Sequence, residues 1–378
     1  MTEQQLLDSG FESVAAAFSE TLVPDQASGA ALSIWLDGHP VVELWGGTAD
    51  ARTKQPYGPS TLDRVYSCTK GVASVLVGRL IQQGLLPSLD TPVSELWPEF
   101  AAHGKGNVSI GDALAHRAGL SAPREELPRD EALNDMHLAD ALAAQEPLWE
   151  PGTHHMYHSA THGALTAKLV RIATGLSIGS YLAAEAALPL DADVHIGLPA
   201  REDHRLSALV MVDLPEETPP TSDPEALHWV TRARDVFGPF SFENLSDPAL
   251  VRHELAGMGG VATASGLAKF WSATVTVTDG IRLIDDDMVA ALSVPRSSGP
   301  GYFAKDGLPP FQAWGAGVMV PSDWTPYLSP RSFGHDGAGG QVAFADPDSR
   351  VGFAYTTNRW GDWRRAISII TALRAALR

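Results

Sequence analysis

The sequence predicts an α+β fold in which an antiparallel β-sheet is flanked by N- and C-terminal helices and carries an inserted, mostly helical lobe. Strand-like runs lie near both ends of the chain, helical patterns fill the stretch between them, and a helix-like segment stands at each end. The simplest arrangement joins the two ends in one sheet. We therefore expect residues 1–80 and 255–378 to form the sheet domain and residues 81–254 the inserted helical domain.

The first elements are a helix and a hairpin. Residues 11–22 have the pattern of an amphipathic helix and lack the basic and then apolar order of a signal peptide. Two β-rich runs, residues 30–36 and 41–47, flank Asp37 and Gly38, which is a strong hairpin signal. Because no stretch of 18 apolar residues is free of charge, we predict no transmembrane helix and no membrane partner.

The middle of the chain reads as short helices between Lys70 and Leu188, separated by glycines and prolines. Residues 189–250 are rich in proline, which predicts long excursions over the surface; these prolines are Pro215, Pro219, Pro220, Pro224 and Pro239. Strands return at residues 341–345 and 351–356, joined by a turn. A last helix at about 363–377 places Ile367, Ile370, Leu373 and Leu377 on one face.

Composition excludes some functions. The chain has 378 residues, enough for a large core, and a formal net charge of −18, so phosphates are repelled and a nucleic-acid partner is excluded. Cys68 is the only cysteine, which rules out an intramolecular disulfide and favours a reducing, cytoplasmic location. The sequence leaves open whether the protein is a homo-oligomer.

Residues 67–70 form an S-x-x-K motif directly before an apolar run that suits a buried helix. With Ser67 at the helix start, Lys70 lies one turn on, on the same face. A lysine whose proton is loosened by desolvation or nearby positive charge can take the serine proton, and the helix N-terminus favours negative charge on Ser67. The same motif is also compatible with a serine that caps the helix and a lysine that is exposed to solvent.

Two further motifs supply what a serine–lysine site needs. Tyr157 stands two residues before Ser159, whose hydroxyl we expect to point toward Lys70 or the substrate. A tyrosine beside a cationic lysine loses its proton more easily and can serve as a base or relay. Residues 333–340 are glycine-rich and precede a strand, so a backbone N–H there can complete an oxyanion hole with that of Ser67. Taken alone, the tyrosine motif is better explained by a partly buried tyrosine at a helix start, and the glycine-rich motif is explained equally well by a hairpin entry.

The order S-x-x-K, Y-x-S, H-D-G resembles the serine hydrolases with the class C β-lactamase fold, and most closely the family VIII carboxylesterases. Flanking segments extend the resemblance to residues 10–375: the L-x-H-x-x-G-L turn at residues 114–120, W-x-P-G at 149–152, the glycine-pair segment at 259–267 and the final strand pair from 334. Taken together, the motifs are specific for this family, although no single motif is.

The resemblance implies a role for each matching residue. Ser67 is the nucleophile, and Lys70 and Tyr157 share the base and acid work. The N–H of Ala338 is the second oxyanion donor. Ser159 stands where the β-lactamases usually carry Asn, and His335, Asp336 and Gly337 stand where they carry Lys-Thr-Gly. The resemblance implies no cofactor and no metal.

Two positions that differ from the β-lactamase pattern, His335 and Asp336, affect which substrates the site can bind. A neutral His335 cannot hold a carboxylate as the lactamase lysine does, and Asp336 adds a negative charge beside the site. Both changes favour neutral esters with small acyl groups. We therefore predict a carboxylesterase that works through an acyl-enzyme, with a β-lactamase, a D-alanyl peptidase or a sensor that acylates without turnover as alternatives.

Other signals lack their structural context. Ser177 lies in a G-x-S-x-G match, but a helix rather than a strand precedes it, so we expect Gly175 to end that helix and Ser177 to cap the next. His154, His158 and His162 recur every four residues without a carboxylate or cysteine to complete a metal site. The G-x-G-x-x-A match at residues 257–262 has no leading strand. Cys68 points about 100° away from Ser67 on a helix.

Overall fold

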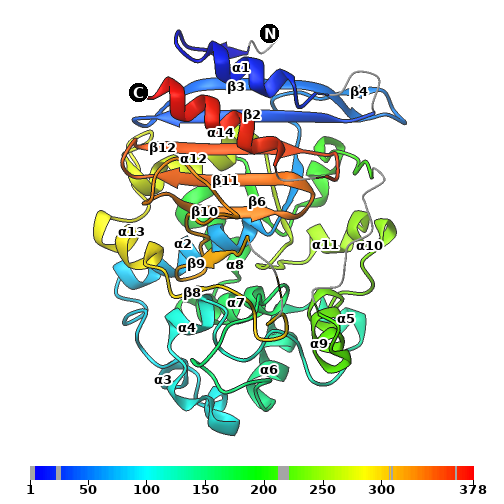
Figure 1. Cartoon of the computed structure of the whole chain (residues 1–378), viewed down its shortest axis with the longest axis vertical. Coiled ribbons are helices and arrows are strands. Elements are labelled where there is room, and N and C mark those ends of the chain that lie inside the picture. Colours follow the sequence, from blue (N-terminus) through cyan, green and yellow to red (C-terminus); the bar gives the residue numbers. More distant parts are fainter. Residues whose placement is uncertain (1–4, 23–26, 212–220, 306, 308–309, 362–363) are drawn as a thin grey trace.

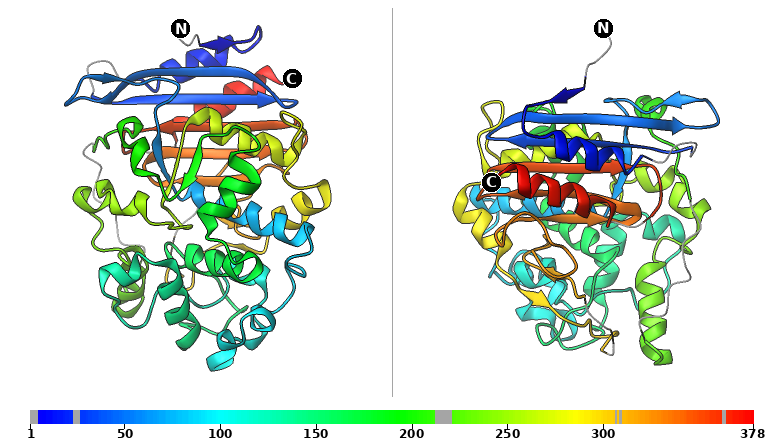
Figure 2. Two further views of the ribbon diagram at one scale, coloured as in Figure 1. Left: turned by 180° about the vertical axis from the view of Figure 1, so that it is seen from behind. Right: turned by 45° about the horizontal axis from the view of Figure 1, so that its top comes forward.

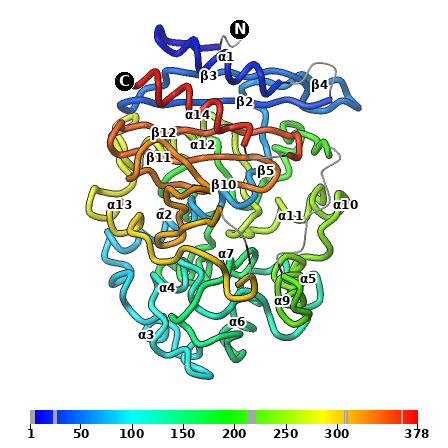
Figure 3. The backbone as a smooth tube through the Cα atoms, in the orientation of Figure 1, coloured from blue at the N-terminus to red at the C-terminus, as the bar shows by residue number. Residues whose placement is uncertain are grey.

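The two ends of the chain share one antiparallel sheet, as the sequence predicts. The computed structural model describes residues 5–22, 27–211, 221–305, 307, 310–361 and 364–378. The strand order is β1-β3-β2-β12-β11-β10, with β4 paired to β3. Figure 3 shows N-terminal β2 directly beside C-terminal β12. The strands are β1 (Leu6–Leu7), β2 (Gly29–Leu36), β3 (His39–Asp50), β4 (Gln55–Pro56), β10 (Phe333–Gly337), β11 (Gln341–Asp346) and β12 (Val351–Thr357).

The hairpin between β2 and β3 turns at Asp37 and Gly38, as expected. Both residues have positive φ, 52° and 82°, which a tight hairpin turn requires. Any side chain at Gly38 would also collide with the chain, since a Cβ there would lie 2.2 Å from the Val277 carbonyl oxygen. The turn therefore sets the register in which β2 pairs with β3 and, through β12, the whole sheet.

Helices cover both faces of this sheet. The terminal helices α1 (Glu12–Ser19) and α14 (Arg365–Ala376) lie side by side on one face (Figure 2, right). Ile370 and Leu373 of α14 are buried in the same apolar cluster as Phe18 of α1. Helices α12 (Ala264–Val275) and α2 (Cys68–Gln82) pack on the opposite side. The predicted flanking by both terminal helices is thus confirmed, and α2 is held between sheet and helices.

The residues between the two halves of the sheet form a mostly helical region below it (Figure 1). The remaining helices are α3 (Val93–Leu96), η1 (Pro98–Asn107), α4 (Ile110–Leu114), α5 (Arg129–Ala132), α6 (Asp135–Ala144), α7 (Thr161–Thr174), α8 (Ile178–Leu182), η2 (Ala183–Ala187), η3 (Ala200–Arg205), α9 (Pro224–Arg234), α10 (Phe242–Ser246), α11 (Ala249–Arg252), α13 (Asp286–Ser293) and η4 (Ala338–Gly340). The α+β class is confirmed, and the domain limits at residues 81 and 254 stay a prediction.

Two small sheets complete the fold. One has the order β5-β7-β6, made of β5 (Asp63–Tyr66), β7 (Gly260–Ala262) and β6 (Val194–Ile196). The other pairs β8 (Ser297–Ser298) with β9 (Ala313–Trp314). Strand β5 runs directly into α2, so the smaller three-stranded sheet fixes where α2 begins.

The proline-rich stretch contains more helix than the sequence indicated. Helix α9 spans 11 residues and begins with Pro224, whose missing N–H costs nothing in the first helical turn. The Asp223 side chain caps this helix by accepting from the Glu225 N–H. Pro215, Pro219 and Pro220 lie outside the described residues. Across the described ranges, no helix combines the length and apolar character needed to cross a membrane.

Candidate active site

Ser67 stands at the junction between β5 and α2, where the predicted helix begins. Its predecessor Tyr66 has a φ of 43°, a left-handed conformation that is unusual for a bulky residue and typical of strained functional positions. The Thr69 hydroxyl donates to the Tyr66 carbonyl and accepts from the Gly260 N–H at 2.9 Å, which ties the first turn of α2 to β7. Ser67 remains partly exposed although the residues on both sides are buried.

Two residues predicted from separate motifs, Lys70 and Tyr157, converge on the Ser67 hydroxyl. The Tyr157 OH donates to Ser67 Oγ at 2.8 Å, and Lys70 Nζ donates to the same oxygen at 3.2 Å. Lys70 Nζ also donates to the Gly257 carbonyl at 2.6 Å and lies 4.8 Å from the centre of the Tyr157 ring. The Ser67 oxygen therefore lies within reach of two groups that can exchange protons with it.

Burial moves the pKa values of these two groups in opposite directions. Lys70 is fully buried, which disfavours its charged form and lowers its pKa to about 7. Burial raises the pKa of Tyr157, so its hydroxyl keeps its proton and donates it to Ser67. The sequence argument expected nearby Lys70 to ease deprotonation of the tyrosine; instead, desolvation of the phenolate is the largest effect on the Tyr157 pKa and raises it. Lys70 is the better base of the two.

His116 and Trp314 hold Tyr157 in place. The Tyr157 ring stacks on Trp314 with 5.7 Å between ring centres and meets the edge of the His116 ring at 5.0 Å. His116 has a φ of 65°; its carbonyl accepts from the Met156 N–H and its Nδ1 from the His158 N–H. His116 thus binds the residue on each side of Tyr157, which explains the histidine in the 114–120 turn.

Strand β10 lies against the start of α2. The Cys68 thiol donates to the His335 carbonyl at 3.0 Å, and a Cβ at Gly337 would lie only 2.3 Å from the Val65 carbonyl oxygen. This close approach of two backbones places Ala338, the residue after β10, beside the segment that carries Ser67. The buried Cys68 has a pKa raised well above that of an ordinary thiol, so it is a structural donor rather than a thiolate nucleophile.

His335 and Asp336 point to opposite sides of β10, because successive residues of a strand alternate. His335 packs against Gly71 of α2, and burial together with the charge of Lys70 lowers its pKa to about 3, so it is neutral as expected. Asp336 instead accepts from the Tyr327 OH at 2.8 Å, and burial raises its pKa to about 7. It is only partly ionised near neutral pH, unlike the full negative charge expected from the sequence.

Ser159 does not bind Lys70. The hydrogen bonds that the described structure gives to the Lys70 ammonium go to Ser67 and Gly257. Ser159 is partly exposed, and a role toward the substrate stays a prediction.

Behind the three central residues lies a set of buried imidazoles whose gathering around His116 the sequence motifs did not indicate. Rings of His158 and His162 lie 5.5 and 5.2 Å from that of His116, and burial lowers the pKa of all three, so they are neutral imidazoles. His154, the remaining residue of the four-residue repeat, is exposed. Among the residues that the structure describes, no group of three or more His, Cys, Asp or Glu could hold a metal.

Ser177 is a helix cap, as expected. Gly175 ends α7 with a φ of 73°, and Ser177 begins α8 by accepting from the Ser180 N–H. Its hydroxyl donates to Glu254 at 2.9 Å. The G-x-S-x-G match therefore follows a helix and lacks the strand that a nucleophile elbow needs.

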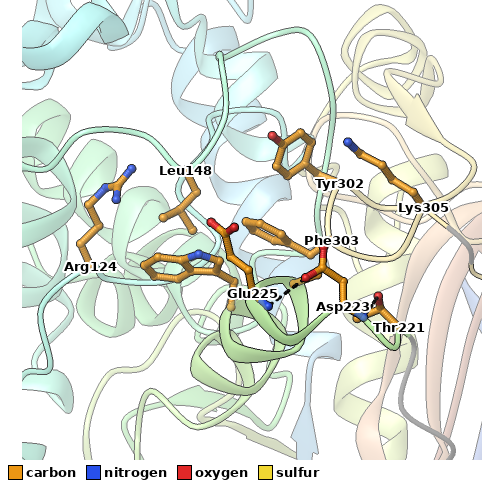
Figure 4. Close-up of a pocket in the computed structure, with 10 residues that line it drawn as sticks. Arg124, Leu148, Thr221, Asp223, Glu225, Tyr302, Phe303 and Lys305 are labelled. Carbon is orange, nitrogen blue, oxygen red and sulfur yellow. Dashed lines mark hydrogen bonds between the residues drawn. The ribbon is translucent and has the colours of Figure 1, made fainter.

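A pocket of about 330 Å³ lies between α9 and the segments that carry Leu148 and Tyr302 (Figure 4). Trp229 and Phe303 line it, and Tyr302 stacks on Trp149 at 5.2 Å. The Tyr302 N–H donates to the His155 carbonyl at 2.8 Å. Arg124, Glu225 and Lys305 add charges at its margin (Figure 4).

Comparisons with known proteins show the family and the fold of the chain. A family model described as Beta-lactamase matches residues 14–377. The chain is 31% identical over 373 residues to the esterase/beta-lactamase LipL of Mycobacterium tuberculosis, with 93% of this chain and 82% of the relative covered. A solved family VIII carboxylesterase is 31% identical with a TM-score of 0.88. A penicillin-binding protein homologue from Caulobacter crescentus is 31% identical with a TM-score of 0.84; both structural matches cover 99% of each chain.

Proposed function

Since the chain belongs to the beta-lactamase family, we propose that it is a serine carboxylesterase that works through an acyl-Ser67 intermediate. One observation carries the proposal: Ser67 Oγ accepts from both Tyr157 and Lys70, and burial depresses the pKa of the lysine to about 7. A serine needs such a base to become a nucleophile. The likeness to a family VIII carboxylesterase supports an ester as the substrate.

In the acylation step, neutral Lys70 accepts the Ser67 proton while Oγ attacks the carbonyl carbon of the ester. The N–H groups of Ser67 and Ala338 hold the oxyanion that forms. When the tetrahedral intermediate collapses, the C–O bond to the alcohol breaks. The leaving oxygen takes the Tyr157 proton, and Lys70 returns its proton to the tyrosine.

Deacylation repeats these steps with water. The Lys70–Tyr157 pair accepts a proton from the water, whose oxygen attacks the acyl carbon. Collapse breaks the bond to Ser67 Oγ, which regains a proton from the same pair. The acid leaves, and the enzyme returns to its starting state.

The residue at position 335 favours neutral substrates. His335 stands where a lactamase lysine would hold a carboxylate, and it is buried and neutral. We propose esters with small acyl groups as substrates. The relative described as both esterase and β-lactamase gives the second candidate, β-lactam hydrolysis through the same serine.

The nucleophile is tested by replacing Ser67. Ser67→Ala should lower turnover of a p-nitrophenyl ester by about 10⁴- to 10⁶-fold and abolish labelling by a fluorophosphonate. Ser177→Ala is the matched control and should keep most of the activity, because Ser177 caps α8. Mass spectrometry of the labelled peptide identifies the modified serine.

Three outcomes separate the candidates. Label on Ser177, or an active Ser67→Ala variant, would overturn the assignment. A single burst without steady turnover would indicate a sensor. Nitrocefin turnover that exceeds ester turnover would identify a β-lactamase.

A further inference from the structure

Asp135 is a buried carboxyl group that the catalytic assignment leaves unexplained. It is 7% exposed at the first position of α6. It does not cap that helix, because the preceding Asn134 side chain already accepts from the Met136 N–H. Its Oδ2 accepts from the Ala256 N–H at 2.9 Å, while its Oδ1 has no hydrogen-bond partner among the described residues. A buried carboxyl group with an unpaired oxygen is costly, so it calls for a functional reason.

The hydrogen bond from Ala256 connects Asp135 to the catalytic lysine. The next residue, Gly257, accepts from Lys70 Nζ at 2.6 Å. This segment has no freedom to shift toward α7, since a Cβ at Gly163 would lie 2.1 Å from the Gly257 nitrogen. Asp135, Ala256, Gly257 and Lys70 thus form one continuous series of contacts that ends at Ser67.

The charges around Lys70 give Asp135 a second influence. The other titratable groups around Lys70 are neutral near pH 7, because burial raises the pKa of the Cys68 thiol and the Tyr157 hydroxyl and lowers that of the surrounding imidazoles. These imidazoles belong to His116, His158, His162 and His335. Asp135 raises the Lys70 pKa when it is ionised. Burial and the charge of Glu254 in turn raise the pKa of Asp135 to about 7.

We propose that Asp135 is a positioning residue for Lys70: its carboxyl group holds the Ala256–Gly257 backbone against the lysine, and its charge sets how much of the lysine is deprotonated. The inference rests on the proposed function, in which neutral Lys70 is the base. Deprotonation of Lys70 then controls the acidic limb of the kcat/KM profile. An ionised Asp135 favours protonated Lys70 and moves that limb to higher pH.

Asp135→Asn separates the two roles. The amide oxygen can still accept from the Ala256 N–H, but the charge is lost. The acidic limb of kcat/KM for p-nitrophenyl acetate should therefore move to lower pH by about half to one unit, with the plateau within about threefold of native. Asp135→Ala removes the acceptor as well, and its kcat should fall at least about tenfold with a smaller change in KM.

Two further variants control for indirect effects. Asp140→Asn removes an exposed charge from the same helix, where Asp140 pairs with Lys168 at 2.7 Å, and should leave the profile unchanged. Glu254→Gln should lower the pKa of Asp135, increase its ionisation and move the limb to higher pH. This opposite shift tests the charge effect without altering Asp135. The test therefore remains valid even if the Asp135→Asn variant folds poorly.

The outcomes are distinct. An acidic limb in Asp135→Asn that superimposes on the native one, or an equal shift in Asp140→Asn, would overturn the inference. Failure of the proposed function would show itself separately, as an active Ser67→Ala variant.

Discussion

The Ser67 hydroxyl accepts from two groups whose acidities differ sharply. Burial lowers the pKa of Lys70 to about 7 and raises that of Tyr157, because each group is pushed toward its neutral form. A neutral lysine accepts a proton, whereas a protonated tyrosine can give one. This difference supports the proposed roles of Lys70 as base and Tyr157 as acid on a single oxygen.

Lys70 and Tyr157 should consequently act as a unit. We expect Lys70→Ala, Tyr157→Phe and the double variant to lose similar amounts of kcat/KM, about 10³-fold or more, because each change stops the same proton transfer. Steady-state turnover of p-nitrophenyl acetate measures the three losses, and circular dichroism confirms folding. Single losses that simply add in the double variant, or near-normal turnover by Tyr157→Phe, would contradict a shared role.

The sequence predicted the three central residues of the candidate site but not the residues that surround them. Ser67, Lys70 and Tyr157 belong to recognisable spacings whose order is informative. His116, Asp135, His162 and Gly257 come from separate parts of the chain, and no spacing links them. Their proximity to Lys70 depends on how α2, α6, α7 and the segment before β7 pack. The fall in the Lys70 pKa follows from that packing, so it could not be read from the motif.

Among elements, the contact between β10 and α2 positions the proposed oxyanion hole. Gly337 lies against β5, the strand that leads into α2, with the Val65 carbonyl oxygen 2.3 Å from the place of a Cβ. Gly337→Ala must move one backbone away from the other, and so should separate the N–H groups of Ser67 and Ala338.

We expect Gly337→Ala to lower kcat at least about tenfold, because a misplaced oxyanion donor weakens transition-state binding more than substrate binding. Gly58→Ala is the matched control: a Cβ at Gly58 meets nothing within 4 Å, and its backbone is not left-handed. Steady-state kinetics and thermal unfolding are measured for both. If the kcat of Gly337→Ala stays within about twofold of the native value, β10 does not position the oxyanion hole.

Elements near the chain ends were predictable because their local signals agree with their tertiary setting. Residues 30–36 and 41–47 are β-rich and flank a turn whose residues, Asp37 and Gly38, adopt the expected positive φ. Helix α9 was missed because Pro224 reads as a breaker, yet it occupies the one helical turn that tolerates proline. Local pattern alone cannot distinguish a proline that starts a helix from one that prevents it.

Across the whole molecule, charge should select substrates. The net charge of −18 repels anions over a distance set by salt. The Debye length falls from about 30 Å at about 0.01 M salt to about 8 Å at about 0.15 M. Within the site, neutral His335 offers no cation to offset this repulsion.

The native enzyme should therefore hydrolyse neutral p-nitrophenyl acetate far better than anionic nitrocefin, and salt should narrow the gap. Between those two salt concentrations, we expect kcat/KM for nitrocefin to rise about two- to tenfold while that for the ester stays constant, because only an anion gains from screening. His335→Lys should raise the nitrocefin-to-ester ratio about tenfold or more at both concentrations, since a buried cation facing a carboxylate acts at short range. A ratio that neither salt nor His335→Lys changes would show that pocket shape, rather than charge, sets the preference.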